Sequence, residues 1–344
     1  MINLNLSTKS KSLKLMFATL AAAQLLTFHT YAHADEATPN ALEATNALDI
    51  STAPVEAKNA DSKEPEPPWN LSCTLSFVSD YRARGISATW LGPAVQGSVD
   101  LTHESGFYSG VWASTVSDES TAGAHKEIDI YVGFGNAFKA IEGLSYTTGL
   151  YGYLFPGGNY SKFAALTSVD GSKRRETYDT FELMGGLTYK WLTAKAWVTL
   201  NDYFGQNRKT GWTRNTKGST YYELSAIVPL PFWGLDLTAG IGRTHVPGKV
   251  SSDPAFILPN SDFDGVLVRE KKLDYTDYRL GIIKTYEVKK ATTLTTSLTY
   301  IGATNSGMND YWGENGFGGG SVIVGSKPKN VGQQTVVLNL SINF

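Results

Sequence analysis

Two arginines separated by a single residue are the most chemically distinctive feature of this sequence. Arg82 and Arg84 lie in the segment 81–85 (YRARG), where a glycine follows them directly. Guanidinium groups stay charged at any physiological pH and can hold a carboxylate or a phosphate through two hydrogen bonds. The segment is therefore a candidate for solute binding or ion filtering. The alternative, favoured because exposed ion pairs are common and specific sites are few, is structural pairing with nearby carboxylates: Asp80, Glu127 or Asp129.

Recognisable catalytic and metal-binding motifs are absent from the sequence. Neither Gly-x-Ser-x-Gly nor His-Glu-x-x-His occurs, and the phosphate-loop motif is missing as well. His103, His125 and His245 lack the spacing of metal ligands, and Cys73 is the sole cysteine. We therefore expect neither an enzyme nor a bound metal or cofactor. A membrane hydrolase that uses an Asp and a His at its rim is the less favoured alternative.

A two-residue alternation of apolar and polar side chains begins at Trp69 and continues to the end of the chain. The last segment shows it most clearly, since Val336, Leu338 and Leu340 alternate with Val337, Asn339 and Ser341. About twelve such segments follow one another, each of roughly the ten residues that a tilted strand needs to cross a bilayer. Beyond the N-terminal region, no uninterrupted apolar stretch reaches the roughly 18 residues expected of a membrane-spanning helix. The pattern predicts an all-β protein of about twelve strands, with about ten or fourteen as alternatives.

The connections between these segments alternate in length. Short connections such as 103–106 and 138–143 alternate with long ones such as 83–93 and 155–176. Outer-membrane barrels have short periplasmic turns, long outer loops and an even number of strands, whereas a soluble sandwich has no reason to alternate in this way. Residues 69–344 are therefore predicted to form a closed antiparallel transmembrane β-barrel.

The polar phase of each strand should face the interior if the apolar phase faces lipid. An Arg or Lys on the lipid side near mid-bilayer costs about 2–4 kcal/mol, which agrees with the absence of charges from the apolar phase. Opposed charges inside could filter ions through a transverse field, or they could pair and plug a narrow barrel. The excess of acidic groups favours a weak preference for cations. The predicted interior residues are Asp80, Arg82, Arg84, Gln96, Asp100, Glu127, Asp129, Glu182, Lys195, Asn201, Glu223, Asp236, Asp277 and Arg279.

The two ends of the chain carry export signals. Three lysines precede a short apolar stretch, and the small-x-small triplet 32–34 follows it, so residues 1–34 are predicted to be a signal peptide cleaved after Ala34. Residues 35–68 are acidic, lack aromatic side chains and end in prolines, which predicts a disordered spacer. Phe344 ends the last alternating strand and resembles the C-terminal signal by which the barrel-assembly machinery recognises its clients.

The first half of the predicted barrel resembles the TorF family, an outer-membrane family once catalogued as uncharacterised and described as porin-like. The resemblance covers about residues 70–160 well and the remainder loosely. What it implies is a barrel with a porin-like role. The segments that carry it are 79–87 (SDYRARGIS), 93–97 (PAVQG), 103–108 (HESGFY), 110–114 (GVWAS), 127–133 (EIDIYVG) and, more weakly, 203–205 (YFG).

These observations predict a passive channel for small hydrophilic solutes or ions in the outer membrane of a Gram-negative bacterium. The expected partners are membrane lipid, the barrel-assembly machinery and the solutes themselves. A net charge of -2 gives no reason to expect nucleic acid, and no strand stands out as an oligomer interface. A non-conducting barrel that serves as an adhesin or a structural wall component is the alternative, because long loops rich in Tyr, Trp and Asn would suit surface contact.

Overall fold

The computed structural model describes residues 68–121, 123–160, 176–210, 212–251, 270–304 and 329–344. The predicted signal peptide, its cleavage after Ala34, and the predicted spacer up to residue 67 lie outside the described residues.

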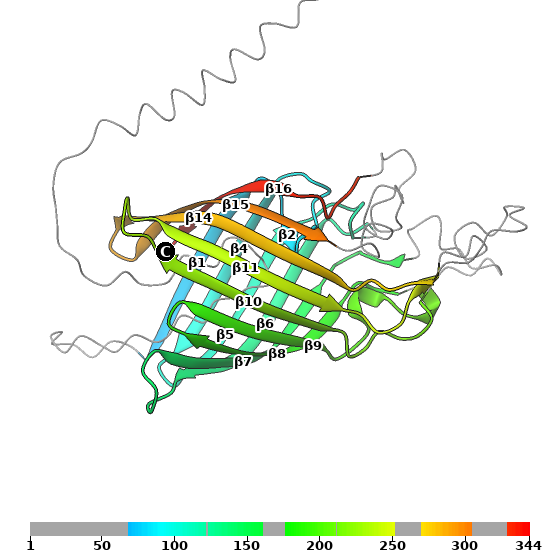
Figure 1. Ribbon diagram of the computed structural model, residues 1–344, viewed down its shortest axis with the longest axis horizontal. Coiled ribbons are helices and arrows are strands. Elements are labelled where there is room, and N and C mark those ends of the chain that lie inside the picture. The colour runs from blue at the N-terminus through cyan, green and yellow to red at the C-terminus, as the bar shows by residue number, and fades with distance from the viewer. Residues whose placement is uncertain (1–67, 122, 161–175, 211, 252–269, 305–328) are drawn as a thin grey trace, which may run out of the picture. The chain divides into compact units, whose positions relative to one another are not determined.

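Twelve antiparallel strands close into one barrel (Figure 1), which confirms the predicted fold class and strand number. Each strand pairs with its neighbours along the chain, and β1 closes the ring by pairing with β16. Closure leaves no free sheet edge, so the backbone groups of every strand find partners within the wall. The strands are β1 (Trp69–Val78), β4 (Ala94–His103), β5 (Phe107–Thr115), β6 (Lys126–Ala137), β7 (Leu144–Leu154), β8 (Thr180–Tyr189), β9 (Leu192–Thr199), β10 (Thr220–Pro229), β11 (Asp236–His245), β14 (Tyr275–Lys289), β15 (Thr292–Thr304) and β16 (Thr335–Asn343).

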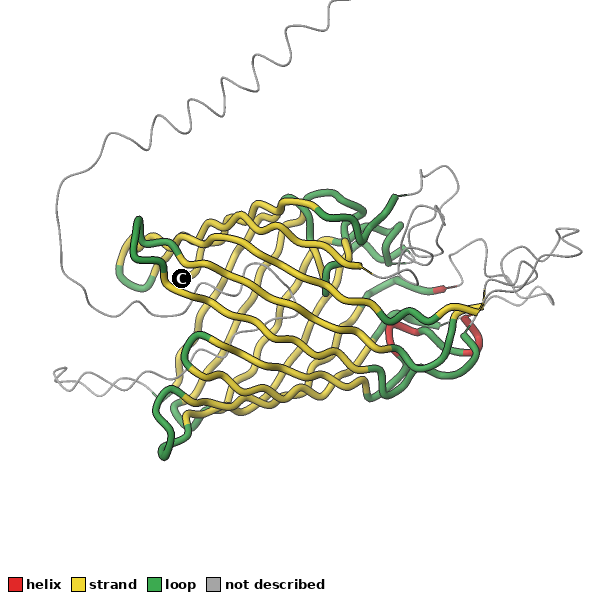
Figure 2. The backbone as a smooth tube through the Cα atoms, viewed as in Figure 1, coloured by secondary structure: helices red, strands yellow, loops and turns green. Residues whose placement is uncertain are grey.

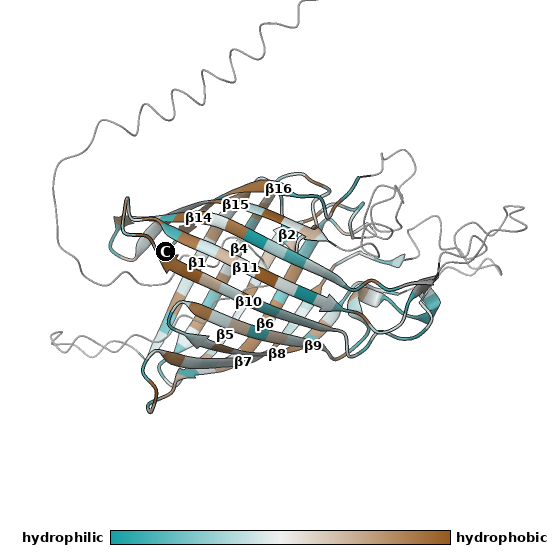
Figure 3. Ribbon diagram, viewed as in Figure 1, coloured by the Kyte–Doolittle hydropathy of each residue, from teal (hydrophilic) through white to brown (hydrophobic). Residues whose placement is uncertain are grey.

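The alternation read from the sequence sorts side chains to the two faces of the wall. On β16, Val336 and Leu340 are exposed, whereas Asn339 and Ser341 are buried. Apolar residues recur along the outer surface of the barrel strands (Figure 3), and the buried set on the other face is rich in polar and charged residues. Because successive side chains of a strand point to opposite faces, one register shift would exchange the two sets. The wall therefore has an apolar outside and a polar inside.

Short turns join the strands at one end of the barrel, where the C-terminus also lies, and longer connections join them at the other (Figure 2). The two shortest turns use left-handed backbone at Lys190 and Ala291, which suits two-residue hairpin connections. Exposed aromatic side chains lie toward both ends of the strands. Phe77, Phe181 and Tyr222 lie toward the end with the long connections. A larger group lies at the short-turn end and in the turns: Trp69, Phe138, Tyr189, Trp191, Phe232, Trp233, Tyr286 and Phe344. Such residues favour membrane interfaces, because one part of the ring is apolar and the other can be wet.

The remaining described elements are small. Hairpin β2 (Arg82–Ala83) with β3 (Ile86–Ser87) lies between β1 and β4, and β12 (Val250–Ser251) pairs with β13 (Glu270–Lys271). Two single turns of 3-10 helix, η3 (Tyr203–Gly205) and η4 (Arg208–Thr210), follow β9. No helix among the described residues is long and apolar enough to cross a lipid bilayer.

Candidate functional site: an arch inside the barrel

The segment with the two arginines is not part of the first strand. Strand β1 ends at Val78, and residues 80–92, which we call the arch, contain hairpin β2–β3. Asp80, Arg82 and Arg84 therefore belong to the arch, which corrects the prediction that they lie on the polar phase of a first strand continuing from β1. The physical reason is a turn: Arg84 and Gly85 both have left-handed backbone (φ 48° and 79°), which reverses the chain within two residues.

The tip of the arch touches the wall. A Cβ atom added at Gly85 would lie 2.7 Å from Cβ of Asp277 on β14 and 3.0 Å from the carbonyl oxygen of Gly302 on β15. Distances below 3.0 Å are not tolerated between such atoms, so only glycine fits this approach as it stands. Gly85 thus serves both the turn and the contact with the wall.

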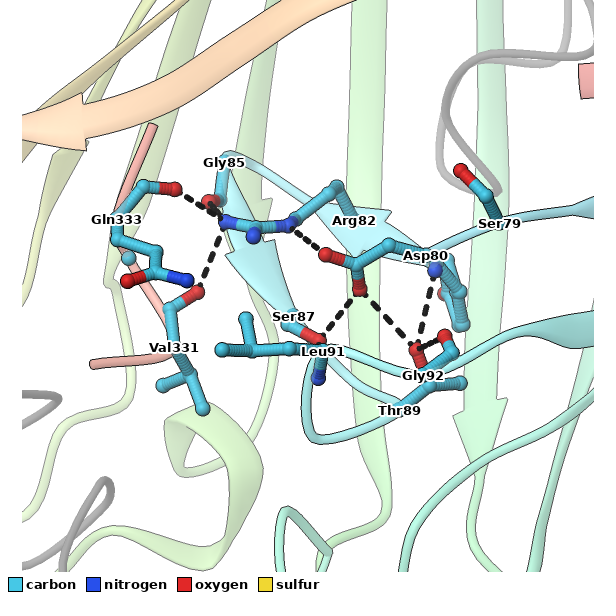
Figure 4. Close-up of polar contacts among 12 residues, drawn as sticks. Ser79, Asp80, Arg82, Gly85, Ser87, Thr89, Leu91, Gly92, Val331 and Gln333 are labelled. Carbon is cyan, nitrogen blue, oxygen red and sulfur yellow. Dashed lines mark hydrogen bonds and ion pairs between the residues drawn. The ribbon is translucent and has the colours of Figure 1, made fainter. Parts of the chain in front are cut away.

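Arg82 fastens the arch to the chain just before β16 (Figure 4). Its Nε donates to Oδ2 of Asp80 at 2.7 Å, and its Nη1 donates to the carbonyl oxygens of Gly85 (3.1 Å), Val331 (3.0 Å) and Gln333 (2.9 Å). The side chain is 2% exposed. Nε binds the Asp80 carboxylate while Nη1 binds the backbone carbonyls, so one planar guanidinium holds both at once, which the single nitrogen of a lysine could not do in the same way.

Hydroxyl groups complete the inner structure of the arch. Ser87 donates from Oγ to Oδ1 of Asp80 at 2.6 Å, and its backbone N–H donates to the carbonyl oxygen of Val331 at 2.8 Å. The Thr89 hydroxyl accepts from the N–H of Tyr81 and donates to the carbonyl oxygen of Gly92. These bonds fix Asp80 from two sides, so the Asp80–Arg82 pair is held by a hydrogen-bond network rather than by charge alone.

Arg84 reaches the far wall. Its Nη2 lies 2.5 Å from Oε2 of Glu182 on β8, and both side chains are almost fully buried. The guanidinium carbon lies 4.4 Å from the ring centre of Tyr221 on β10 and 5.9 Å from that of Trp197 on β9. In the ring of strands β8 is separated from β1 by four strands on one side and six on the other. The arch therefore crosses the interior and is held at both ends.

The expected pairing of the arginines is only partly what the structure contains. Arg82 pairs with Asp80, one of the three anticipated partners, but Arg84 pairs with Glu182 rather than with Glu127 or Asp129. Glu182 was predicted to face inward, yet its pairing with Arg84 was missed. Gly85 was the one sequence signal for this difference, because a glycine favours a turn, and a turn at that point directs Arg84 away from the first strand.

A second charged group lies on the strands beside the arch. Nη1 of Arg279 on β14 donates to Oε2 of Glu223 on β10 at 2.7 Å. The Tyr221 hydroxyl lies 3.1 Å from Oδ1 of Asp277 and 3.2 Å from Oε2 of Glu223. Tyr221 therefore links this group to Arg84, which packs over its ring, and charged side chains occupy the interior at the level of the arch.

The other predicted interior residues lie elsewhere on the wall. Lys195 on β9 is buried with its Nζ 5.9 Å from the ring centre of Trp197, and Gln96 on β4 donates to Ser114 at 3.3 Å. Asp100 accepts hydrogen bonds from the hydroxyls of Tyr131 and Ser98. Two residues lie at strand ends, both half-buried: Asn201, which bonds the backbone of Phe181 and Asp179, and Asp236, which begins β11.

No set of three or more potential metal-ligating side chains is present within the described ranges. His245 pairs with Asp274 through Nδ1 at 2.9 Å, but the described side chains place no hydroxyl nucleophile in hydrogen-bond contact with this histidine. Cys73 on β1 is a half-buried free thiol. The interior of the barrel is therefore the part of the described chain where charged side chains concentrate.

Comparison with known proteins finds one matching protein family and several solved structures with similarity to the chain. The family described as "bacterial protein of unknown function (Gcw_chp)" matches residues 62–319. No curated protein sequence matches the chain.

Three solved structures with similarity to the chain are an outer membrane channel from Pseudomonas putida F1, the NanC porin, and the outer membrane protein OprD from Pseudomonas aeruginosa. The first is 15% identical with a TM-score of 0.40, over 84% of this chain and 99% of that one. The NanC porin is 8% identical with a TM-score of 0.39, over 80% and 99% of the two chains. OprD is 9% identical with a TM-score of 0.31, over 80% and 64%. With such TM-scores these similarities say nothing about the activity of this chain.

Proposed function

The chain belongs to the Gcw_chp family of bacterial proteins of unknown function, and we propose that it is an outer-membrane channel through which small hydrophilic solutes or ions diffuse. The role requires no reaction and no cofactor, because diffusion down a gradient needs only a hydrated polar path. The TorF-like segments between residues 79 and 133 fit the same role.

The observation that carries this proposal is the opposite character of the two faces of one closed wall. Apolar residues such as Leu298 (48% exposed) and Leu280 (55% exposed) lie outside, whereas the buried inward phase carries polar, charged and aromatic side chains. A bilayer accepts β-structure only as a closed barrel, since each unpaired backbone group in hydrocarbon is costly. A soluble protein gains nothing from so much exposed apolar surface. The predicted signal peptide and the terminal Phe344 support delivery to the barrel-assembly machinery and the outer membrane.

The arch makes this a narrow channel. Barrels of about eight strands fill with side chains, and those of about 16–18 hold an aqueous channel. In a barrel of twelve strands the width of the channel therefore depends on which segments and side chains lie inside the wall. Here the arch, pinned by Arg82 and Arg84, crosses the interior. We therefore expect small conductance and the exclusion of large solutes.

The charge of the interior supports a weak preference for cations. The inward set contains eight carboxylates and four basic groups within the described residues. Three of the basic groups are paired with carboxylates, namely Arg82, Arg84 and Arg279. The other ionisable groups of the inward set are mostly carboxylic, and a lining of ionised carboxylates concentrates cations and repels anions.

The experiment that tests the proposal is single-channel recording of the refolded protein without residues 1–34 in a planar lipid bilayer. Discrete current steps are expected, with a reversal potential in a KCl gradient that shows a modest preference for K⁺ over Cl⁻. Folding is checked independently by heat-modifiable electrophoretic mobility. A folded barrel that gives no steps would overturn the proposal, and steps with a preference for anions would overturn the charge assignment.

A further inference from the structure

Asp129 is a buried carboxylate without a visible partner. It lies on β6 with its side chain 1% exposed, and neither of its carboxylate oxygens accepts a hydrogen bond from the described residues. The two neighbours of Asp129 along the strand, Ile128 and Ile130, are more exposed, so its carboxylate belongs to the inward phase. The ionised form of such a group is unfavourable unless a cation lies beside it, because burial removes the water that would otherwise solvate the charge.

Aromatic rings surround this carboxylate. Trp112 on β5 and Tyr153 on β7 are its two direct neighbours across the sheet, one on each side. Tyr81 of the arch packs against Trp112, with ring centres 5.5 Å apart and planes at 64°. Tyr81 also lies close enough to interact electrostatically with Asp129 and Glu127. The carboxylate therefore lies in an aromatic setting formed partly by the wall and partly by the arch.

Within the described residues Asp129 has no cation of the protein's own as a partner. Glu127 and Glu182 are the charged groups that act most strongly on Asp129, and both are carboxylates. Arg84, the nearby guanidinium, is already paired with Glu182. Among the described residues no Lys or Arg comes within ion-pair distance of Asp129.

We propose that Asp129, with Glu127, Trp112, Tyr153 and Tyr81, forms a binding site for organic cations that bear a protonated amine or a guanidinium group. This inference rests on the proposed channel function and names its preferred class of solute. A carboxylate gives such a cation short, charge-assisted hydrogen bonds, and the faces of Trp and Tyr attract it further. A metal ion fits less well, because no set of three metal-ligating side chains exists in the described parts of the chain.

The position of the site suits a solute that enters from the end with the long connections. Asp129 is the fourth residue of β6 counted from that end, and the arch covers it from the interior. Since Asp129 is almost inaccessible, Tyr81 must move aside when the cation binds. The cation then replaces the missing partner of the carboxylate.

The first test measures binding apart from conduction. Ethylguanidinium and its neutral isostere ethylurea are titrated calorimetrically into the refolded protein in detergent. Saturable binding of ethylguanidinium is expected, at least about tenfold tighter than that of ethylurea, which corresponds to about 1.4 kcal/mol. D129N should abolish the difference between the two probes. Equal binding of both probes, or an unchanged preference in D129N, would overturn the site.

Two further variants serve as a control and as a second test of the site. D236N removes an inward-phase carboxylate at the start of β11 and should leave the preference for ethylguanidinium unchanged. W112L should weaken ethylguanidinium binding without affecting ethylurea, so the site can be tested even if D129N folds poorly. A loss of preference in D236N as large as in D129N would show that overall charge, not this site, selects the cation.

The second test uses the single-channel recordings. Ethylguanidinium added on the side of the long connections should block the K⁺ current transiently, and D129N should shorten the blocks at least about tenfold. Current steps without such block would refute the site and leave the channel function standing. Binding in detergent without any current steps would refute the channel and leave the site standing.

Discussion

The guanidinium of Arg84 and the carboxylate of Glu182 meet at 2.5 Å although 98 positions separate them in the sequence. Arg84 belongs to the segment that follows β1, and Glu182 lies on β8, several strands away around the ring. Their contact ties the arch to a distant part of the wall. This buried ion pair therefore helps to hold the arch across the interior at this level.

Replacing Glu182 with Gln should release the arch and widen the channel. The change leaves a buried guanidinium without its counter-charge, and breaking a buried pair in this way destabilises by about 3–5 kcal/mol. We expect a larger and noisier single-channel conductance and a lower midpoint of urea unfolding in vesicles. Arg84→Gln should act in the same direction.

The double variant R84Q/E182Q is the matched control for that pair. It removes both charges together, so its loss of stability should be clearly smaller than the sum of the two single losses. Additive losses would mean that the two side chains do not stabilise each other.

Arg82→Lys should loosen the arch without changing the sign of the ion preference. Lysine keeps the charge but has a single nitrogen, so it cannot donate to Asp80 from one position and to the carbonyl oxygens of Val331 and Gln333 from another. The expected result is frequent fluctuation between conductance levels, recorded in the same KCl gradient. A variant with steady wild-type steps would show that the charge alone holds the arch.

Gly85→Ala should displace the tip of the arch. The new Cβ would lie 2.7 Å from Cβ of Asp277, in addition to the strain of a left-handed backbone. Gly218→Ala separates the two effects, because Gly218 is also left-handed (φ +84°) but has no atom within 4 Å of the added Cβ. Conductance should change in Gly85→Ala and not in Gly218→Ala; equal changes would trace the effect to the backbone alone.

The strands could be predicted from the sequence because their physical cause is local. On β16, Val336 and Asn339 point to opposite faces because successive side chains of a strand alternate. Lipid on the outside requires apolar residues on that face, so the alternation can be read in the sequence. Connection lengths added the order of the strands and the end at which the chain finishes. Closure of β1 on β16 followed from the expected barrel.

The place of the arch inside the barrel could not be predicted, since the turn that Gly85 indicates fits an inward segment and an outer loop equally. The alternating pattern of Asp80, Arg82 and Arg84 looks like a continuing strand, yet the turn at Gly85 ends that register. Glu182 carries no mark in the sequence that would select it as the partner of Arg84. Such a pairing depends on the curvature of the closed wall and on which segment folds into it.

Leu298→Arg tests which face of the wall meets lipid. Leu298 lies near the middle of β15 and is 48% exposed, so a charge there should cost about 2–4 kcal/mol in a bilayer. Trp233→Arg places the same charge in a turn, where the cost should be about 0–1 kcal/mol. The measurement is urea unfolding in phospholipid vesicles. Equal costs at the two positions would contradict the assigned membrane span.

The most direct test of the central claim, that the arch constricts a conducting barrel, compares the wild-type conductance with that of a variant in which a short Gly-Ser turn replaces residues 80–92. Both proteins are refolded without residues 1–34 and recorded in the same planar bilayer. We expect discrete steps from both, with a conductance several-fold larger and a weaker discrimination between solutes in the variant. Folded barrels with equal conductance, or with none, would contradict the claim.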